Sequence, residues 1–488
     1  MEKRILLIRT FKDVGAGGPL PPLELLYIAS AIMRSFDHKY QIKIIDTGLG
    51  NLSLSDIKVI LNGFNPGIIC LNALVWEAGL VHQIASLAKA NNKNVYVFVQ
   101  GQLATLAKDC LLQDENIDYV VIAEADKTVC ELLEVLENGH NPEAVDGIIF
   151  REKSNIVATR PRSFINNLDD FQIPGSTWDL IPIKEYARYP NWNGNLKEKF
   201  YIPILTSRGC PFNCIFCCNR ECFGKRFRAR SAENVFSEIM LLREKYNVKE
   251  IHIYDIVFNY DPERVKQICR LIINSKIDLS LAFPHGLRAD LMNDELITLL
   301  RKAGTYKLVY GIETASARLQ RKVGKNLNLE QVTNIINKTH QAGIIVGGYF
   351  ILGFPNETVD EMRQTIDFAA NSNLDLAYFF KATRFADIVD IYKSRVNPIN
   401  QIQIETALGL CYYSKNKFTQ GLSSTELNKI LLEGQQKFYL NFNRLRRGFV
   451  KSTDKVNFLK NMFNLAAIML QGYLTKQLAK EEFSKRNA

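Results

Sequence analysis

The sequence predicts an α/β protein: an N-terminal doubly wound parallel sheet of the Rossmann type, a partial (β/α)6 barrel of the TIM type, and a helical C-terminal region. Three observations predict this class. A chain of 488 residues exceeds one hydrophobic core, because single cores stop growing near roughly 250 to 300 residues. Short apolar runs alternate with helical periods in two separate stretches. Hydrophobic residues make up 47% of the chain and charged residues 23%, which is typical of a globular protein and excludes a disordered or collagen-like chain.

The first domain is expected at residues 1–145, where five short apolar runs each precede a helical period. The predicted strands are 5–8, 42–45, 67–71, 95–99 and 119–122. The predicted helices are 23–33, 55–62, 78–91, 103–112 and 127–137. Continuous apolar strands in βα units indicate a parallel sheet covered on both faces, whose ligands bind beyond the carboxyl ends of the strands.

The second domain is expected at residues 196–395, after a connector at 146–195 that is rich in Pro, Asn and aromatic residues. Its predicted strands are 200–206, 250–254, 279–283, 307–311, 344–352 and 376–380. Its predicted helices are 232–246, 262–275, 294–303, 329–341 and 359–371. Six strands in strict alternation predict a partial barrel with its chemistry at the C-terminal strand ends.

The remaining residues, 396–488, form a basic and helical region. Its apolar run 465–470 is shorter than the roughly 18 residues that a membrane-spanning helix needs. We expect this run to dock on the barrel in preference to lying on a membrane surface.

The N-terminus and the cysteines indicate the cellular compartment in which the chain is expected. Only four consecutive apolar residues, 5–8, stand between charged residues at the start, so no secretory signal is expected and the chain is predicted to be cytoplasmic. Five of the ten cysteines fall within 210–222, and in a reducing compartment such a cluster more often binds a metal than forms disulfides. The net charge of +10 is a mild bias towards anionic partners.

Three of these cysteines follow the first barrel strand directly, as Cys210, Cys214 and Cys217. Three thiolates at this spacing can each bind one iron of an iron–sulfur cluster and leave a fourth iron open to a small molecule. Cys218 and Cys222 could instead complete a zinc site. A structural zinc protein that binds nucleic acid through the basic segment 220–230 therefore stays open as an alternative.

This cysteine spacing, with Phe216 just before the last cysteine, resembles the identifying motif of the radical S-adenosylmethionine (SAM) enzymes. The resemblance implies that Cys210, Cys214 and Cys217 ligate a 4Fe–4S cluster whose open iron binds the amino and carboxylate groups of SAM. Electron transfer into SAM would then release methionine and a 5′-deoxyadenosyl radical. The electron would come from a donor such as a flavodoxin or ferredoxin.

Residues at other strand ends fit a SAM site. Arg288 is placed to pair with the methionine carboxylate of SAM, or else forms a surface pair with Asp290. Glu313 lies in a segment that resembles the family's Gly-x-Glu-Ser motif, near the ribose and amino group of SAM. A carboxylate there can accept hydrogen bonds from both groups. The role of Asp255, after the second strand, stays open.

The segment 347–358 resembles the family's fifth-strand motif beside the adenine of SAM. Gly348 and Gly353 lie in it, and missing side chains there let a flat ring approach the backbone. The sequence identifies no catalytic acid or base.

The first domain resembles the cobalamin-binding class of the same family, and residues 22–30 are similar to the opening helix of that class. Two segments differ from relatives, which commonly have Gly-Gly-Pro and Gly-Glu-Gly-Glu there. This chain has Gly101-Gln102-Leu103 and Ala123-Glu124-Ala125-Asp126. The added side chains stand where backbone must approach the corrin ring, so two hypotheses remain.

The first hypothesis is a cobalamin-dependent methyltransferase acting on an unactivated carbon of a small-molecule or natural-product substrate. The second keeps the radical chemistry but has no cobalamin, which gives a rearrangement, cyclisation or oxidation.

Overall fold

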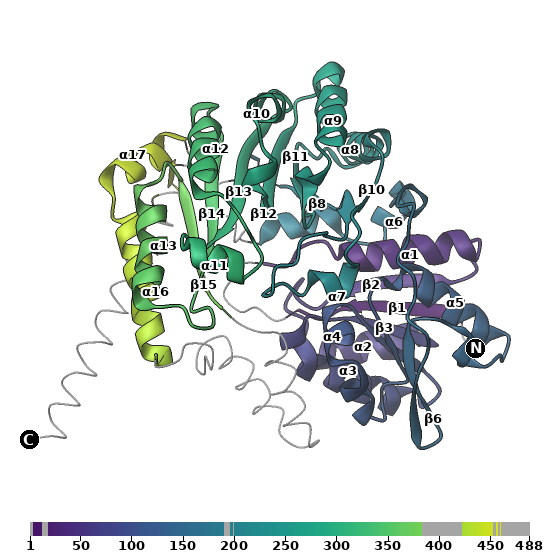
Figure 1. The fold of residues 1–488 in the computed structure, drawn as a ribbon. Coiled ribbons are helices and arrows are strands. Elements are labelled where there is room, and N and C mark those ends of the chain that lie inside the picture. The colour runs from purple at the N-terminus through teal and green to yellow at the C-terminus, as the bar shows by residue number, and fades with distance from the viewer. Residues whose placement is uncertain are drawn as a thin grey trace, which may run out of the picture.

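The computed structural model describes residues 3–11, 18–189, 196–198, 200–382, 422–451, 455, 456 and 459. Two β-sheets lie next to each other, the first at the lower right of Figure 1 and the second above it, with the C-terminal helices against the second sheet. Among the described helices, none has the length and apolar character to cross a membrane.

The first sheet has seven strands in the order β2-β1-β3-β4-β5-β6-β7. Its parallel strands are β1 (Arg4–Arg9), β2 (Gln41–Asp46), β3 (Ile68–Asn72), β4 (Tyr96–Gln100) and β5 (Tyr119–Val121). The helices between them are α1 (Leu23–Ser35), α2 (Leu54–Phe64), α3 (Ala78–Asn91), α4 (Gln102–Ala107) with a 3-10 turn at Lys108–Gln113, and α5 (Ala125–Glu137). The predicted doubly wound parallel sheet is confirmed.

Both faces of this sheet are buried, as the apolar strands predicted. In β1, Ile5 and Leu7 face a hydrophobic cluster with α1 and α5, whereas Leu6 and Ile8 face a second cluster with α2 and α3. This alternation follows from the two-residue period of a strand.

The sequence did not predict two further strands, β6 (Ile148–Glu152) and β7 (Asn155–Ala158), which extend the first sheet into the expected connector. Both pair antiparallel, β6 with β5 and β7 with β6. The connector continues through a short helix, α6 (Gly175–Trp178), whose Trp178 is fully buried in the cluster that includes α1.

The second sheet has six parallel strands in the order β15-β14-β13-β12-β11-β8; among the described strands β8 and β15 do not pair with each other, so the barrel is open. The strands are β8 (Ile202–Ile204), β11 (Glu250–Ile253), β12 (Ser280–Leu287), β13 (Thr305–Glu313), β14 (Ile345–Leu352) and β15 (Leu376–Lys381). The helices are α8 (Ala232–Tyr246), α9 (Pro262–Ser275), α10 (Asp294–Lys302), α11 (Ala317–Lys322), α12 (Leu329–Gln341) and α13 (Val359–Asn371). The predicted partial barrel is confirmed.

Capping residues set where the barrel helices begin and end. Asp261, which precedes Pro262 at the start of α9, accepts a hydrogen bond from the backbone N–H of Arg264. Asn328 caps α12 in the same way. Asn247, in the left-handed conformation, ends α8. Such caps satisfy the unpaired groups at helix ends.

A small hairpin of β9 (Ser207–Arg208) and β10 (Arg228–Ala229) follows β8, with helix α7 (Asn219–Phe223) between the two strands. The loop 209–218, which we call the cysteine loop, lies between β9 and α7. The hairpin therefore carries all three predicted cluster ligands.

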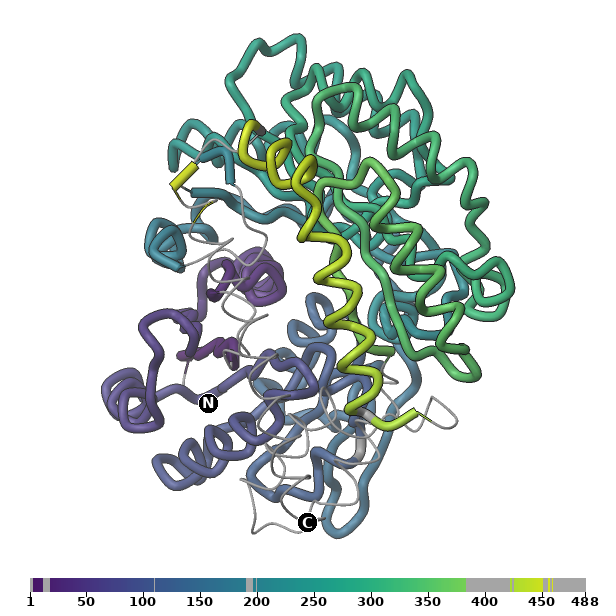
Figure 2. The backbone as a smooth tube through the Cα atoms, turned by 90° about the vertical axis from the view of Figure 1, so that its left-hand side faces the viewer, coloured from purple at the N-terminus to yellow at the C-terminus, as the bar shows by residue number. Residues whose placement is uncertain are grey.

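Two C-terminal helices lie on the outside of the barrel, α16 (Ser424–Tyr439) and α17 (Phe442–Lys451) (Figure 2). Helix α16 packs on α13 and β15 and buries Leu427, Ile430 and Phe438. The apolar run 465–470 lies outside the described residues.

Candidate active site

The cysteine loop carries the three predicted cluster ligands, Cys210, Cys214 and Cys217, all partly buried at the mouth of the barrel. Within the described residues, no three Cys, His, Asp or Glu side chains stand close enough together to hold a metal ion, so the ligand set stays a prediction. The backbone N–H of Cys210 donates to the carbonyl of Gly224, 3.1 Å away, and that of Ile215 donates to Val323, 3.0 Å away. The backbone N–H of Cys217 donates to the carbonyl of Cys214 within the loop. The loop is thus fixed at one end to α7 and at its centre to the turn after α11.

Two glycines permit this close packing. Gly209 has a φ of 82°, and a Cβ there would lie 2.1 Å from the carbonyl oxygen of Arg226. Gly324 has a φ of 72°, and a Cβ there would lie 2.5 Å from the carbonyl oxygen of Asn213. No other residue type could occupy either position without moving the cysteine loop.

Asp255 fixes the point at which the chain enters the cysteine loop. Its carboxylate accepts hydrogen bonds from the backbone N–H of Thr206 at 2.6 Å and from the hydroxyls of Thr206 and Ser207 at 2.5 and 2.6 Å. The side chain is buried, and burial raises its pKa. Within the described contacts, Asp255 therefore has a structural role, which the sequence alone had left open.

Two cations face the cysteine loop. Burial raises the pKa of the Cys214 thiol, and the positive charges of Lys325 and Arg288 oppose that rise. Burial also raises the pKa of the Cys217 thiol to about 12. Because cluster ligands bind as thiolates, nearby cations favour the ligand form.

Glu313 is buried and pairs with Lys325, whose Nζ lies 3.1 Å from its Oε1. Gly311 makes room for this pair, because a Cβ there would lie 2.8 Å from both partner atoms. The sequence did not reveal Lys325, which follows Glu313 by 12 residues and reaches it only through the fold of α11. The SAM-binding role of Glu313 stays a prediction.

Arg288 pairs with Asp290, with Nε and Nη2 at 2.9 and 2.8 Å from the carboxylate oxygens, but this is not the expected surface pair because the Arg288 side chain is buried. Nη2 also donates to the carbonyl of Lys325, and the guanidinium stacks 3.6 Å above the ring of Phe212 in the cysteine loop. Arg288 thus braces the loop. Its pairing with the carboxylate of SAM stays a prediction.

The predicted adenine segment lies beside the cysteine loop, because the rings of Phe216 and Phe354 are in contact with centroids 5.7 Å apart. Gly353 has a φ of 89° and donates its backbone N–H to the buried carboxylate of Glu357. A Cβ on Gly348 would meet the side chains of Phe350 and Leu374 at 2.8 and 2.9 Å, so packing alone explains that glycine. Contacts of Phe216, Gly348 and Gly353 with SAM remain predictions.

A cavity of about 430 Å³ lies between the two sheets. Its walls come from the carboxyl ends of the first sheet and from the barrel mouth, including Asn72, Gln100, Ala123, Leu205, Cys222, Tyr254 and His285. The side chain of Gln100 is buried, and its Nε2 has no hydrogen-bond partner among the described residues. A buried donor without a partner is costly, so this wall suits a ligand with acceptor groups.

The segments that depart from the cobalamin-binding pattern leave this cavity open. Leu103 turns away into the core of the first domain and is fully buried there. Gln102 donates to Sγ of Cys218 at 3.3 Å, and Ala123, with a φ of 61°, adds only a methyl group. Leu103 therefore does not narrow the cavity, whereas Gln102 and the segment Ala123-Glu124-Ala125-Asp126 line it, so the expected narrowing by these side chains stays a prediction. With the unpartnered Gln100 in its wall, the cavity suits a ligand that carries hydrogen-bond acceptors, as the amide side chains of a corrin do.

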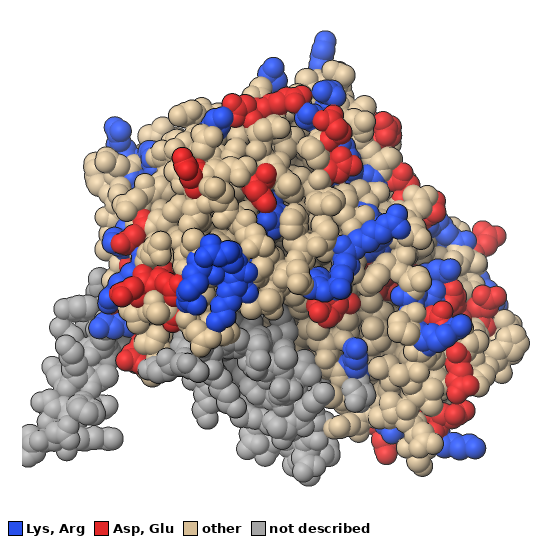
Figure 3. Space-filling view, in the orientation of Figure 1, with Lys and Arg blue, Asp and Glu red and all other residues tan. Residues whose placement is uncertain are grey.

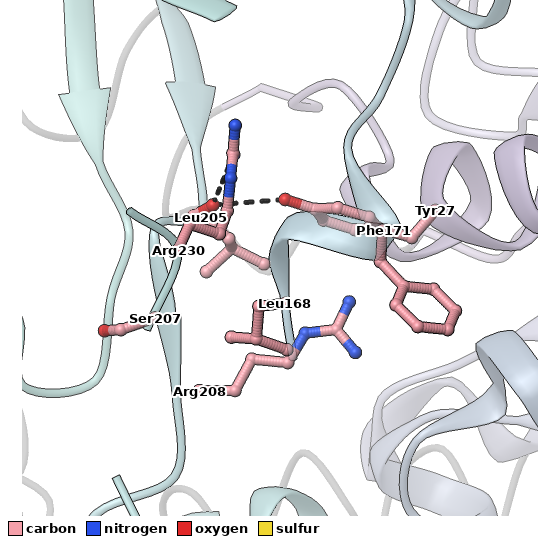
Figure 4. A pocket seen from close by; sticks show the side chains of 7 residues that line it. All are labelled: Tyr27, Leu168, Phe171, Leu205, Ser207, Arg208 and Arg230. Atoms are coloured by element: carbon pink, nitrogen blue, oxygen red, sulfur yellow. Dashed lines mark hydrogen bonds between the residues drawn. The ribbon is translucent and has the colours of Figure 1, made fainter. Parts of the chain in front are cut away.

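Buried ion pairs join the two domains beside this cavity. Arg208 forms two hydrogen bonds with Asp126, at 2.8 and 3.1 Å, and Arg228 pairs with Glu124 at 2.8 Å. The hydroxyl of Tyr27 on α1 donates to the carbonyl of Leu205, which also accepts from Arg230 (Figure 4). The pocket lined by Tyr27, Leu205, Arg208 and Arg230 is only about 10 Å³, room for about one water.

Comparisons with known proteins agree with this arrangement. The Radical SAM superfamily profile matches residues 204–369 and the B12 binding domain profile matches residues 14–133. An uncharacterized methyltransferase of Pyrococcus horikoshii is 32% identical over 373 residues, which cover 76% of this chain and 77% of that protein. The cytidylyl-2-hydroxyethylphosphonate methyltransferase of Streptomyces wedmorensis is 26% identical over 407 residues, covering 74% and 75%.

A solved structure shares the fold. The radical SAM methyltransferase TsrM from Kitasatospora setae, with cobalamin and a 4Fe–4S cluster bound, has a TM-score of 0.64 and 18% identity and covers 78% of this chain and 72% of its own. The matches favour an enzyme over the alternative of a non-catalytic zinc protein. The chain belongs to the radical S-adenosylmethionine superfamily, in the class with a B12-binding domain, and its cofactors are a 4Fe–4S cluster, SAM and cobalamin.

Proposed function

We propose that this enzyme methylates a carbon atom of a small molecule. The carrying observation is that one cavity is lined both by the carboxyl ends of the first sheet and by Cys222 and Phe223 of the helix that follows the cysteine loop. When bound, the cluster and SAM supply a radical that removes a hydrogen atom from the substrate, and cobalamin supplies the methyl group. Both relatives named above are methyltransferases, and TsrM has also been solved with tryptophan as substrate.

In this proposal, the residues of the chain bind and orient the cofactors. Cys210, Cys214 and Cys217 would hold the cluster. Glu313 would accept hydrogen bonds from SAM, and Lys325 holds its carboxylate in place. Gln100 would donate its unpartnered amide N–H to an acceptor on the edge of the corrin ring.

The walls of the cavity would shield part of the reaction site from solvent. Its walls belong to both domains, and the buried pairs of Arg208 and Arg228 close one side of it. Exclusion of water prevents side reactions of a reactive intermediate.

We propose further that the electron donor is an acidic protein such as a flavodoxin or ferredoxin. Ile215, in the centre of the cysteine loop, is 59% exposed. Exposed cations stand on both sides of the loop, Lys225 and Arg226 before β10 and Arg321 and Lys322 on α11, and Figure 3 shows basic groups on this face. A small apolar centre with a basic rim suits a transient acidic partner.

Charge reversal tests this partner. Replacing Arg321 and Lys322 together by glutamate should slow cluster reduction by a flavodoxin at least about tenfold at low salt, because steering is lost. Reduction by titanium(III) citrate should be unchanged. Equal slowing with both reductants would mean that the substitutions damaged the cluster site instead.

The methyl transfer itself is tested with reconstituted enzyme. The cluster is rebuilt without oxygen, hydroxocobalamin is added, and the corrinoid absorption is recorded after desalting. The loaded enzyme is then incubated with methyl-labelled SAM and a small-molecule extract. Retained corrinoid and a labelled product would support the proposal. Loss of all corrinoid would contradict it, and a product formed without the label would mean a radical rearrangement, cyclisation or oxidation.

A further inference from the structure

The exposed apolar side chains of the molecule gather at the end of the described chain. Ten large hydrophobic side chains are exposed among the described residues, and five of them lie between 440 and 459. They are Leu440 at 68%, Phe442 at 77%, Val450 at 72%, Val456 at 79% and Leu459 at 48% exposure. A concentration of this kind marks an interaction surface, whereas single exposed apolar residues need no explanation.

The same segment is strongly basic. Residues 440–460 contain six Lys or Arg and one Asp. Arg444 is buried against the barrel, and Arg446 and Lys455 are exposed among the described side chains of the segment. On α17, Phe442, Arg446 and Val450 follow each other at intervals of four residues, so one face of the helix presents apolar, cationic and apolar side chains in turn. All three are exposed.

The opposite side of α17 is held firmly on the barrel. The guanidinium of Arg444 is buried and donates to the carbonyls of Leu374, Phe438, Ala370 and Ser372 at 2.7 to 3.0 Å. Arg447 donates to the side chain of Asn373 at 3.1 Å. These contacts fix which face of α17 points outward, and Figure 2 shows the helix on the outside of the molecule.

We propose that this surface, α17 with Leu440, Val456 and Leu459, binds the surface of a lipid bilayer that contains anionic lipid. Aliphatic and phenyl side chains bury into the boundary between headgroups and acyl chains, and the cations between them pair with anionic headgroups. A polynucleotide would also attract the charge but would leave Val450, Val456 and Leu459 in water.

The attachment leaves the active-site cavity free. The anchoring carbonyls at 370–374 precede β15 and lie at the amino ends of the barrel strands, whereas the cavity lies at the carboxyl ends. The surface therefore positions the enzyme at a membrane with its cavity facing away. This inference does not depend on the proposed methyl transfer.

Vesicle sedimentation of the full chain tests the proposal. The protein is mixed with vesicles of phosphatidylcholine and phosphatidylglycerol, or of phosphatidylcholine alone, and the bound fraction is measured at low and high salt. Binding should require phosphatidylglycerol and fall with salt. The combined change Phe442→Glu and Val450→Glu should lower the affinity at least about tenfold, and Arg446→Glu should lower it in part.

Val59→Glu is the matched control, because Val59 is 70% exposed but lies on α2 of the first domain. It should bind vesicles like the unchanged protein. Thermal melting identifies any variant that is misfolded. If a variant is misfolded, the salt dependence of vesicle binding by the unchanged protein decides the test. Absence of vesicle binding, equal binding to both lipid mixtures, or undiminished binding of the double variant would overturn the proposal. So would tighter binding to an RNA duplex than to vesicles, or a dimer that the double variant abolishes.

Discussion

Cys214 and Cys218 are four residues apart but have different surroundings. Cys214 lies under Lys325 and Arg288, whereas Cys218 is buried and accepts a hydrogen bond from Gln102 of the first domain. Replacing Cys214 by alanine should abolish cluster-dependent cleavage of SAM, because one of three ligands is lost. Cys218→Ala should leave most of the cleavage intact. Iron and sulfide content together with methionine release measure both, and equal losses would show that the ligand assignment is wrong.

The carboxyl group of Glu357 makes stability depend on pH. Burial raises its pKa to about 7, and the backbone N–H groups of Phe354 and Gly353 oppose this. Because the folded pKa is higher than the ordinary value of 4.5, the protonated form is favoured by folding, and its contribution is lost as the pH rises from about 4.5 to 7. The loss amounts to about 3 kcal/mol.

The change Glu357→Gln should therefore stabilise the protein relative to the unchanged chain at pH 8 more than at pH 5. Thermal melting at the two values measures this, with Glu330→Gln on the exposed side of α12 as control. A difference between variant and unchanged protein that is the same at both pH values would contradict the raised pKa.

At the scale of elements, the start of α5 is joined to the β9–β10 hairpin by buried charges. Replacing Asp126 by alanine leaves Arg208, among the described ion pairs, with the longer contact to Glu124, 3.6 Å away, beside its stacking on the ring of Tyr27. Breaking a buried pair from one side typically costs about 3 to 5 kcal/mol. The double change of Asp126 and Arg208 should cost less than the sum of the single changes, as measured by a double-mutant cycle in thermal melting. Additive losses would mean that the pair does not couple the two elements.

Most elements could be predicted because their patterns are long and regular. Helices α3, α8, α9, α12 and α13 have the predicted bounds. Each has an apolar stripe, and all of them except α3 also begin at a side-chain cap. The hairpin β9–β10 could not be predicted, because two-residue strands leave no periodic pattern. The strand β7 has an exposed side and no apolar alternation, and it forms only because β6 offers an edge.

Part of the site could be predicted from the sequence for a related reason. Its cysteines and Glu313 lie in short local motifs at strand ends, and such motifs can be recognised from the sequence alone. The roles of Lys325, Gln100 and Arg208 depend on residues distant in sequence, such as the contact between Arg208 and Asp126 across 82 positions. Local patterns carry no information about such contacts.

At the scale of the molecule, the hydrophobic cluster around α1 continues from the first sheet into the barrel, through Ile5 and Leu26 to Ile202 and Ile253. The domains should therefore melt together, and a ligand held between them should stabilise both. Cobalamin at about 100 times its dissociation constant should add about 2.7 kcal/mol. The melting temperature with and without hydroxocobalamin measures this. Two transitions, of which only one shifts, would argue against a shared core.

The cavity between the two sheets also has a consequence for how the enzyme folds during expression. A wall assembled from both halves exists only when the halves have come together, so filling the site and completing the fold are linked events. Cells short of the vitamin would accumulate a chain that unfolds more often and is cut more readily by proteases. The yield of intact protein should then follow the supply of the vitamin during expression, and feeding it to the culture is the first condition to vary.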